Sequence, residues 1–336
     1  MGRWRLLLAL CVSFVGVCRS EATSGDRIDE VEAAQLALYA PPAAIPYPEA
    51  DPFSAAKARL GRDLFFDPIL SGAGNLSCST CHDPARSWSD GLGRSVGTSG
   101  SPMALRSPSL IDVAWMGRLG WDGKFRDIEA VTFSPITAHD NMDLPEAEAI
   151  ARLKAKPAYV QEYLDAFGTA DIQRRGIEQA VATYERSILS GEAPFDRWAA
   201  GDGAAVTPAA KRGFALFNGR AGCASCHSGW AFSDGSFHDI GTAAGGDVGR
   251  GRLFPTSVKL RYAFKTPTLR DVARRGPFMH DGSLPTLRAV IDLYDRGGVP
   301  RPSRADEIHP LALSEGDKDD LLAFLGTLTA GSPPSN

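Results

Sequence analysis

Two short motifs constrain this chain more than any other feature of its sequence. The pattern Cys-x-x-Cys-His occurs at 78–82 and again at 223–227, with 145 residues between corresponding cysteines. This spacing is the attachment signature of c-type haem. The two thiols add to the vinyl groups on one edge of the porphyrin, and the histidine that follows reaches the iron as an axial ligand. The residues expected to carry two covalently bound haems are Cys78, Cys81, Cys223 and Cys226, with His82 and His227 as iron ligands.

The alternatives for such cysteines are a zinc site and dithiol redox chemistry. A zinc site usually has its two Cys-x-x-Cys pairs about 12–20 residues apart, far closer than the pairs in this chain. A thioredoxin-like motif needs βαβ surroundings, and no such pattern flanks either motif. The two remaining cysteines, Cys11 and Cys18, lie near the N-terminus, so no cysteine is left for a disulfide framework.

The N-terminal segment is typical of a secretory signal peptide. It has a basic start, an apolar stretch at 6–17 and small residues after it. Such a stretch is too short for a membrane span, which needs roughly 20 residues. We therefore predict a signal peptide at 1–22, export to the periplasm and no integral membrane span. An uncleaved anchor and a lipoprotein modified at Cys18 are the alternatives. The net charge of −4 gives no basic surface for nucleic acid.

The two haem motifs lie within a longer internal repeat. Downstream of the first motif, Ser-Pro-Ser-Leu at 107–110 precedes Trp-Asp-Gly at 121–123. Downstream of the second, Thr-Pro-Thr-Leu at 266–269 precedes His-Asp-Gly at 280–282. The interval is 14 residues in both cases. The repeat predicts that the two halves of the chain are related.

The fold class predicted from these patterns is mainly α, with two cytochrome c-like haem domains related by internal duplication. The domains are placed at 23–203 and 204–336. A good N-cap precedes the helix expected before each motif, Ser54 in one case and Thr207 in the other. Helical spacing of apolar residues predicts helices at 55–66, 145–155, 173–189, 208–217, 285–294 and 317–328.

The repeat also predicts that the two irons differ. In the second half, the expected helix near 285 carries Tyr294, 14 residues after His280, and tyrosine can ligate haem iron. The equivalent residue in the first half is Pro135, which has no ligating atom. One iron is then capped and the other open to a small ligand. Met279 is a rival ligand, and a tyrosine on such a helix is more often a core residue.

These residues resemble the bacterial di-haem cytochrome c peroxidase and MauG superfamily over roughly 50–330. The resemblance rests on both haem motifs, on 121–123, on Pro135-Ile136, on 264–270 and on 277–282. It implies that Trp121 conducts electrons between the haems and that Pro135 lies over the open haem. It also implies that Tyr294 is the sixth ligand of the second haem, as in the MauG branch, where peroxidases have methionine.

The chain departs from the family pattern at three places. Thr98 stands where many peroxidases have a histidine that caps the first iron, so the first haem is expected to be open without reductive activation. Asn141 stands where the family has a catalytic glutamate, and the neighbouring Asp140 or His139 is a candidate for that acid–base role. Arg106 stands where the family has an asparagine of an inter-domain calcium site, which puts calcium in doubt.

The sequence therefore predicts a MauG-like oxidoreductase that reacts with hydrogen peroxide at the first haem and oxidises residues of a partner protein. One alternative is a cytochrome c peroxidase that takes its electrons from a small donor cytochrome. An alternative of another class is a non-catalytic di-haem electron carrier with two capped irons.

Overall fold

The computed structural model describes residues 30–331, and the predicted signal peptide at 1–22 lies outside them. The described chain is mainly helical, with long loops and one short antiparallel sheet that pairs Phe237 with Lys265. The helices are α1 Glu30–Ala37, α2 Ala55–Phe66, α3 Cys78–Cys81, α4 Glu129–Thr137, α5 Glu146–Lys154, α6 Pro157–Phe167, α7 Arg174–Arg186, α8 Pro194–Ala199, α9 Pro208–Asn218, α10 Leu287–Arg296 and α11 Glu315–Gly326; the strands are β1 Phe237–His238 and β2 Phe264–Lys265.

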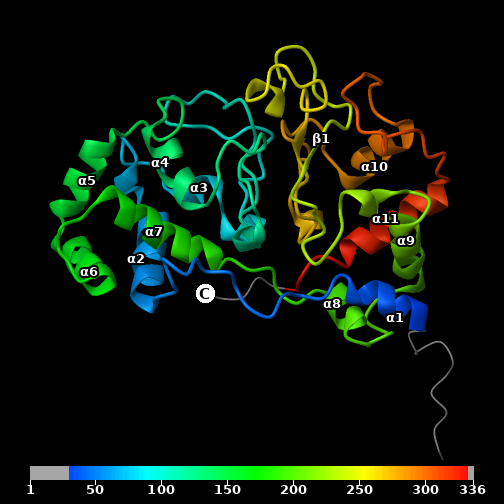
Figure 1. Cartoon of the computed structure of the whole chain (residues 1–336), viewed down its shortest axis with the longest axis horizontal. Coiled ribbons are helices and arrows are strands. Elements are labelled where there is room, and N and C mark those ends of the chain that lie inside the picture. The colour runs from blue at the N-terminus through cyan, green and yellow to red at the C-terminus, as the bar shows by residue number, and fades with distance from the viewer. Residues whose placement is uncertain (1–29, 332–336) are drawn as a thin grey trace, which may run out of the picture.

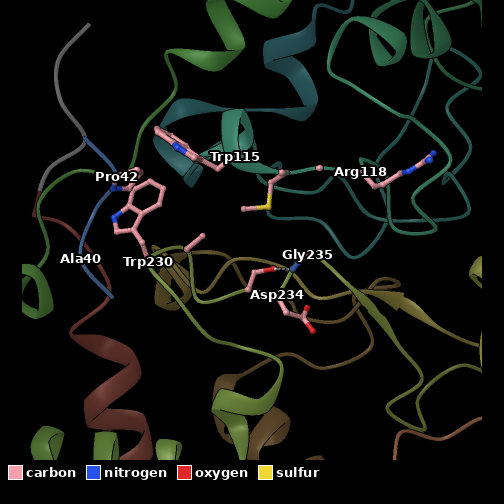
Figure 2. Close-up of a pocket in the computed structure, with 11 residues that line it drawn as sticks. Ala40, Pro42, Trp115, Arg118, Trp230, Asp234 and Gly235 are labelled. Carbon is pink, nitrogen blue, oxygen red and sulfur yellow. Dashed lines mark hydrogen bonds between the residues drawn. The ribbon is translucent and has the colours of Figure 1, made fainter. Parts of the chain in front are cut away.

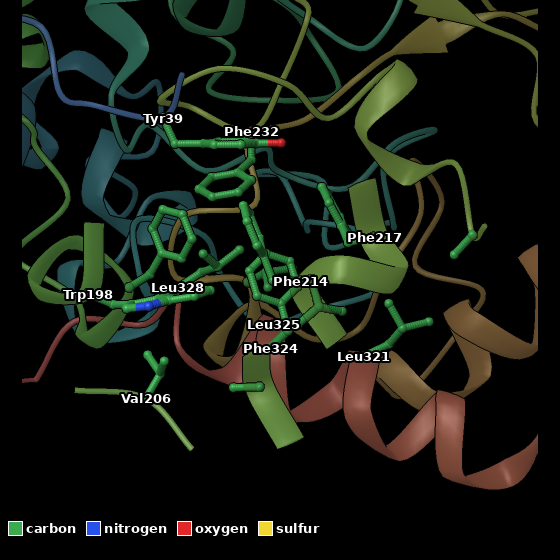
Figure 3. Close-up of a cluster of buried hydrophobic side chains, with 14 of the residues drawn as sticks. Tyr39, Trp198, Val206, Phe214, Phe217, Phe232, Leu321, Phe324, Leu325 and Leu328 are labelled. Atoms are coloured by element: carbon green, nitrogen blue, oxygen red, sulfur yellow. The ribbon is translucent and has the colours of Figure 1, made fainter. Parts of the chain in front are cut away.

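The chain forms two lobes that lie side by side (Figure 1). We call α2 to α7 with their loops the N-terminal lobe, and α8 to α11 with the sheet and α1 the C-terminal lobe. Tyr39, just after α1, and Phe195 and Trp198 of α8 belong to the same buried cluster as Phe214 and Phe324 (Figure 3). By packing, α1 and α8 therefore go with the C-terminal lobe although they precede residue 204. A duplication and a boundary near 203 stay predictions.

The helix starts that the sequence predicts are confirmed. Ser54 accepts a hydrogen bond from Lys57 N at the start of α2, and Thr207 accepts one from Ala210 N at the start of α9. Ser314 does the same for Asp317 N at the start of α11. Each side chain satisfies a backbone N–H that the first helical turn leaves without a partner. The helix before each haem motif therefore begins where local chemistry dictates.

Each lobe is built on two helices that approach closely at a glycine. In the N-terminal lobe α2 packs on α7, and a Cβ atom on Gly61 would lie 1.9 Å from the carbonyl oxygen of Ala180. In the C-terminal lobe α9 packs on α11, and a Cβ on Gly213 would lie 2.0 Å from the carbonyl oxygen of Asp320. Both crossings therefore need a residue without a side chain.

Replacing Gly213 with alanine is expected to lower the free energy of unfolding by about 3 kcal/mol, because the new methyl group meets rigid backbone rather than a side chain that can move. Denaturant unfolding of the haem-loaded protein measures this change. Gly326→Ala is the control in the same helix pair, since a Cβ there meets nothing within 4 Å, and it should be neutral or slightly stabilising. Equal stability of the two variants would contradict the crossing geometry.

None of the helices within residues 30–331 is long and apolar enough to cross a membrane.

Candidate haem centres

The two haem motifs fold in the same way. In each motif, the backbone N–H of the histidine donates to the backbone carbonyl of the first cysteine and closes one turn of the chain. The distance is 2.9 Å from His82 to Cys78 and 2.9 Å from His227 to Cys223. Cys78 packs against the buried cluster between α2 and α7, and Cys223 packs against the cluster between α9 and α11. Each motif therefore lies beside the main helix pair of its lobe.

Both histidines are prepared to bind a metal through Nε2. Nδ1 of His82 lies 3.2 Å from the carbonyl oxygen of Trp88, and Nδ1 of His227 lies 2.8 Å from that of Phe232. Because a carbonyl can only accept, the hydrogen bond assigns the proton to Nδ1 in both rings and leaves the Nε2 lone pair as the metal-binding one. In His82 the Ser107 hydroxyl also lies 3.4 Å from Nε2. Burial lowers the pKa of both imidazoles, which favours the neutral form that a metal requires.

The four cysteines suit a thioether link better than a zinc site. None of them is in a disulfide. Burial raises the pKa of Cys78 and Cys223 to about 12 and that of Cys81 to about 11. Zinc binds thiolates, and burial works against thiolate formation here. Thiols next to a buried histidine instead match the donor set that covalent haem attachment uses.

Arg275 offers a further test of whether a haem fits. Its side chain is 8 % exposed, and its Nε–H is buried without a hydrogen-bond partner among the described residues. The Arg275 charge also contributes to the lowered pKa of His227, which places it close to the second motif. The charges of Asp271 and Asp112 act on Arg275, but its Nε–H is still without an acceptor, and a haem would bring two propionate carboxylates that can accept. The described residues therefore fit a haem at the second motif.

Tyr294 lies on α10, close to the second haem motif. Burial raises the pKa of Tyr294, and the thiols of Cys223 and Cys226 raise it further. Both thiols therefore act electrostatically on the phenol. Among the described residues its hydroxyl makes no hydrogen bond, which leaves the phenolic oxygen available to an iron at this motif. Met279, the rival ligand, lies in the loop before α10.

In the N-terminal lobe, the structure brings Pro135, Thr98 and Asn141 together. Pro135 lies inside α4 and is half-buried. The chain after α4 folds back, so that Met142 N donates to the Pro135 carbonyl at 3.1 Å. Thr98 N donates to the Asn141 carbonyl at 2.8 Å. The two positions at which this chain departs from the peroxidase pattern are therefore direct neighbours, next to Pro135.

His139 and Asp140 lie on the surface. The His139 side chain is 91 % exposed and its Nδ1 lies 3.0 Å from a carboxylate oxygen of Asp143. That hydrogen bond raises the pKa of His139. Asp140 is also exposed, whereas Asn141 is half-buried. Of the three adjacent candidates, Asn141 is the one that the fold withdraws from solvent.

Trp121 lies at the junction of the two lobes. Its indole Nε1 donates to the carbonyl of Arg106 at 3.0 Å, and its own carbonyl accepts from Lys265 N in β2 at 2.8 Å. The next residues are also held across the junction, because Arg250 donates to the carbonyls of Asp122 at 2.7 Å and Gly123 at 3.2 Å. The predicted inter-haem residue therefore has contacts from both lobes.

A cleft of about 530 Å³ opens beside the second motif (Figure 2). Trp115 of the N-terminal lobe and Trp230, three residues after His227, meet there edge to face, with 4.8 Å between ring centroids. Met116 and Arg118 line the same cleft. The cleft brings a pair of half-buried aromatic rings from both lobes close to the second haem motif.

Sequence reasoning missed two charged groups near the motifs. Burial raises the pKa of Glu185 on α7 to about 8, and its charge acts on the Cys78 thiol. His238 of β1 lies 2.7 Å from Asp234, and its contacts with Cys226 and Asp234 raise its pKa to about 9. No spacing in the sequence marks either group, because each reaches its motif through the packing of a separate element.

The chain matches the family profile described as di-haem cytochrome c peroxidase over residues 55–204. It is 47% identical to the methylamine utilization protein MauG of Methylorubrum extorquens, over 97% of this chain and 94% of that protein. It is 33% identical to the cytochrome-c peroxidase IdrP1 of Denitromonas iodatirespirans, over 99% of this chain and 95% of that protein.

Among solved structures, a MauG-like protein associated with microbial copper homeostasis superposes with a TM-score of 0.80. The two proteins are 31% identical, and the match covers 87% of this chain and 93% of the other. The diheme peroxidase BthA of Burkholderia thailandensis shares the fold with a TM-score of 0.73, at 24% identity over 84% of this chain and 88% of that protein. The chain therefore belongs to the di-haem cytochrome c peroxidase and MauG family of peroxidase-type oxidoreductases.

Proposed function

We propose that the protein is a periplasmic, MauG-like oxidase that reacts with hydrogen peroxide and draws electrons from residues of a partner protein. Two covalently bound haems would supply the redox chemistry, in which peroxide takes up two electrons and two protons and yields two waters. The names of two relatives, at 47% and 41% identity, support a role in methylamine utilization. The N-terminal segment at 1–22 supports export.

The observation that carries this proposal is the difference between the two lobes. In the C-terminal lobe, Tyr294 of α10 offers a phenolic oxygen on which the Cys223 and Cys226 thiols act electrostatically. In the N-terminal lobe, the corresponding residue is Pro135, which has no donor atom to close the iron opposite His82. The first centre would bind peroxide. The second would store an oxidising equivalent, because an anionic phenolate stabilises high oxidation states better than a thioether does.

Trp121 would connect the two centres, since hydrogen bonds to Arg106 and Lys265 fix it between the lobes. His82 and His227 would hold the irons through Nε2, with the tautomer fixed by Nδ1. Asn141 would be the residue nearest to the bound peroxide among the acid–base candidates, because it is half-buried beside Pro135, whereas His139 is exposed. An amide cannot shuttle protons as a carboxyl group does, which suits a long-lived oxidant rather than rapid turnover.

Electron paramagnetic resonance of the resting ferric holoprotein tests this proposal. We expect one high-spin signal from an open haem and one low-spin signal from a capped haem. Two low-spin signals would contradict it and favour the non-catalytic electron carrier.

The second candidate function is a cytochrome c peroxidase with a small donor cytochrome, and it is favoured by the 33% identity to IdrP1. Both enzyme functions share the open first haem, so steady-state kinetics separates them. A peroxidase should consume peroxide continuously when a reduced cytochrome is the sole donor. The MauG-like oxidase should do so poorly and should instead keep its oxidising equivalents until a protein substrate is added.

A further inference from the structure

The side chain of Arg106 crosses the junction between the lobes. Its Nη2 donates to the carbonyl of Arg275 at 2.8 Å, and its Nη1 donates to the carbonyl of Pro277. These carbonyls lie 169 and 171 residues away in the sequence. Both backbone carbonyls therefore accept from one cation, the Arg106 guanidinium.

The main chain of Arg106 holds the same junction. Its carbonyl accepts the indole N–H of Trp121 at 3.0 Å, and its N–H donates to the carbonyl of His280 at 3.0 Å. Trp121 and His280 are the residues that correspond in the internal repeat. One residue therefore links Trp121 to the C-terminal lobe through both its main chain and its side chain.

A calcium ion does not fit beside this arginine. Calcium takes about six to eight oxygen ligands, and the Arg275 and Pro277 carbonyls are already bound by N–H groups. Arg106 is 7 % exposed and Arg275 is 8 % exposed; burial lowers the pKa of Arg275, and the Arg106 charge lowers it further. A divalent ion would add to two buried positive charges that already repel each other.

We propose that the guanidinium of Arg106 replaces the inter-domain calcium of the family, and that Arg106 thereby positions Trp121 between the two haem centres. The guanidinium is part of the protein chain, so this link between the lobes does not depend on the concentration of a free ion. The positioning part rests on the proposed function, whereas the replacement of calcium does not.

Calorimetric titration of the holoprotein with CaCl2, after treatment with EGTA, tests the replacement directly. We expect no binding heat, and the same melting temperature in EGTA and in millimolar calcium. Saturable calcium binding that raises the melting temperature of the wild-type protein would overturn the proposal. This readout needs no peroxide, so it stands even if the proposed function fails.

Arg106→Asn tests the tie, with Arg94→Asn as the control because Arg94 is an exposed arginine of the same lobe. Removing the guanidinium leaves the buried carbonyls of Arg275 and Pro277 without their donors, which should lower the melting temperature of R106N by about 5 °C or more, and R94N should melt with the wild type. The amide oxygen with the freed carbonyls offers oxygen ligands to calcium, so added calcium should recover part of the loss. An R106N protein that binds no calcium and melts with the wild type would overturn the assignment.

A spectroscopic readout separates positioning from simple stability. After one equivalent of peroxide at a temperature where both variants are folded, we compare the loss of the low-spin resonance of the second haem in R106N, R94N and wild type. R106N should show a smaller loss, because oxidation of that haem would pass through Trp121. A loss equal to that of the wild type would overturn the positioning role. If the wild type itself shows no loss, the proposed function has failed and the calcium result is unaffected.

Discussion

Replacing Tyr294 with methionine is expected to abolish the long-lived, two-electron-oxidised state that one equivalent of hydrogen peroxide produces in the wild-type protein. A phenolate carries a negative charge that offsets the added positive charge of an oxidised iron, and a neutral thioether does not. Potentiometry should show that the reduction potential of the second haem rises by about 0.1 V or more. That is a fraction of the roughly 0.8 V range that axial ligands give to haem reduction potentials. Stopped-flow absorption after peroxide addition measures the lifetime of the oxidised state.

The position of Tyr294 explains why the effect should be large. Its phenol lies near the Cys223 and Cys226 thiols, and burial raises the pKa of Tyr294. A phenol at this position would lose its proton to solvent on binding a ferric iron, because the metal charge would stabilise the phenolate.

The control for this variant is Tyr262→Met, in the same lobe, where the ring packs under the guanidinium of Arg301 at 4.0 Å. This variant should keep the oxidised state. If Y294M behaves like Y262M, Tyr294 is not the ligand, and Met279 becomes the candidate to replace next.

Helix positions were largely predictable from the sequence where local signals are strong. The helices at 55–66 and 208–217 follow a capping residue and carry regular apolar spacing, and the structure has α2 at Ala55–Phe66 and α9 at Pro208–Asn218. By contrast, α4 was not predicted. It contains Pro135, which removes a backbone donor and usually ends a helix. Packing of Phe133 and Ile136 in the core of the lobe outweighs that local cost.

The candidate site was predictable in its ligands but not in its surroundings. The cysteines and histidines that would bind haem were predictable because each set lies within five consecutive residues. The partners of Arg106 come from 169 and 171 residues away, and no local pattern encodes a contact over that distance. The same holds for Thr98 and Asn141, which meet because a loop after α4 turns back. Loop conformation therefore decided which acid–base candidate is buried.

Replacing Asn141 with glutamate is expected to accelerate the reaction with peroxide by about 10²–10⁴-fold, the usual contribution of a positioned acid–base group. Asn141 is half-buried, and the next residue, Met142, donates its backbone N–H to the Pro135 carbonyl at 3.1 Å, so the new carboxyl group would belong to the turn that folds back on Pro135. Glutamate is one methylene longer than asparagine, and the half-buried position leaves the loop's backbone hydrogen bonds in place. The second-order rate constant with peroxide, followed by stopped-flow absorption, measures the change.

His139→Ala and Asp140→Asn are the matched controls, since both residues directly precede Asn141 in the same turn. Both side chains are exposed, and His139 bonds Asp143 rather than any group near Pro135, so neither change should alter the rate constant appreciably. N141E should also shorten the lifetime of the stored oxidised state, because the new carboxyl group can deliver the protons that reduction of this state consumes. A rate that falls in H139A or D140N while N141E is unchanged would show that one of these two residues, and not position 141, acts on peroxide.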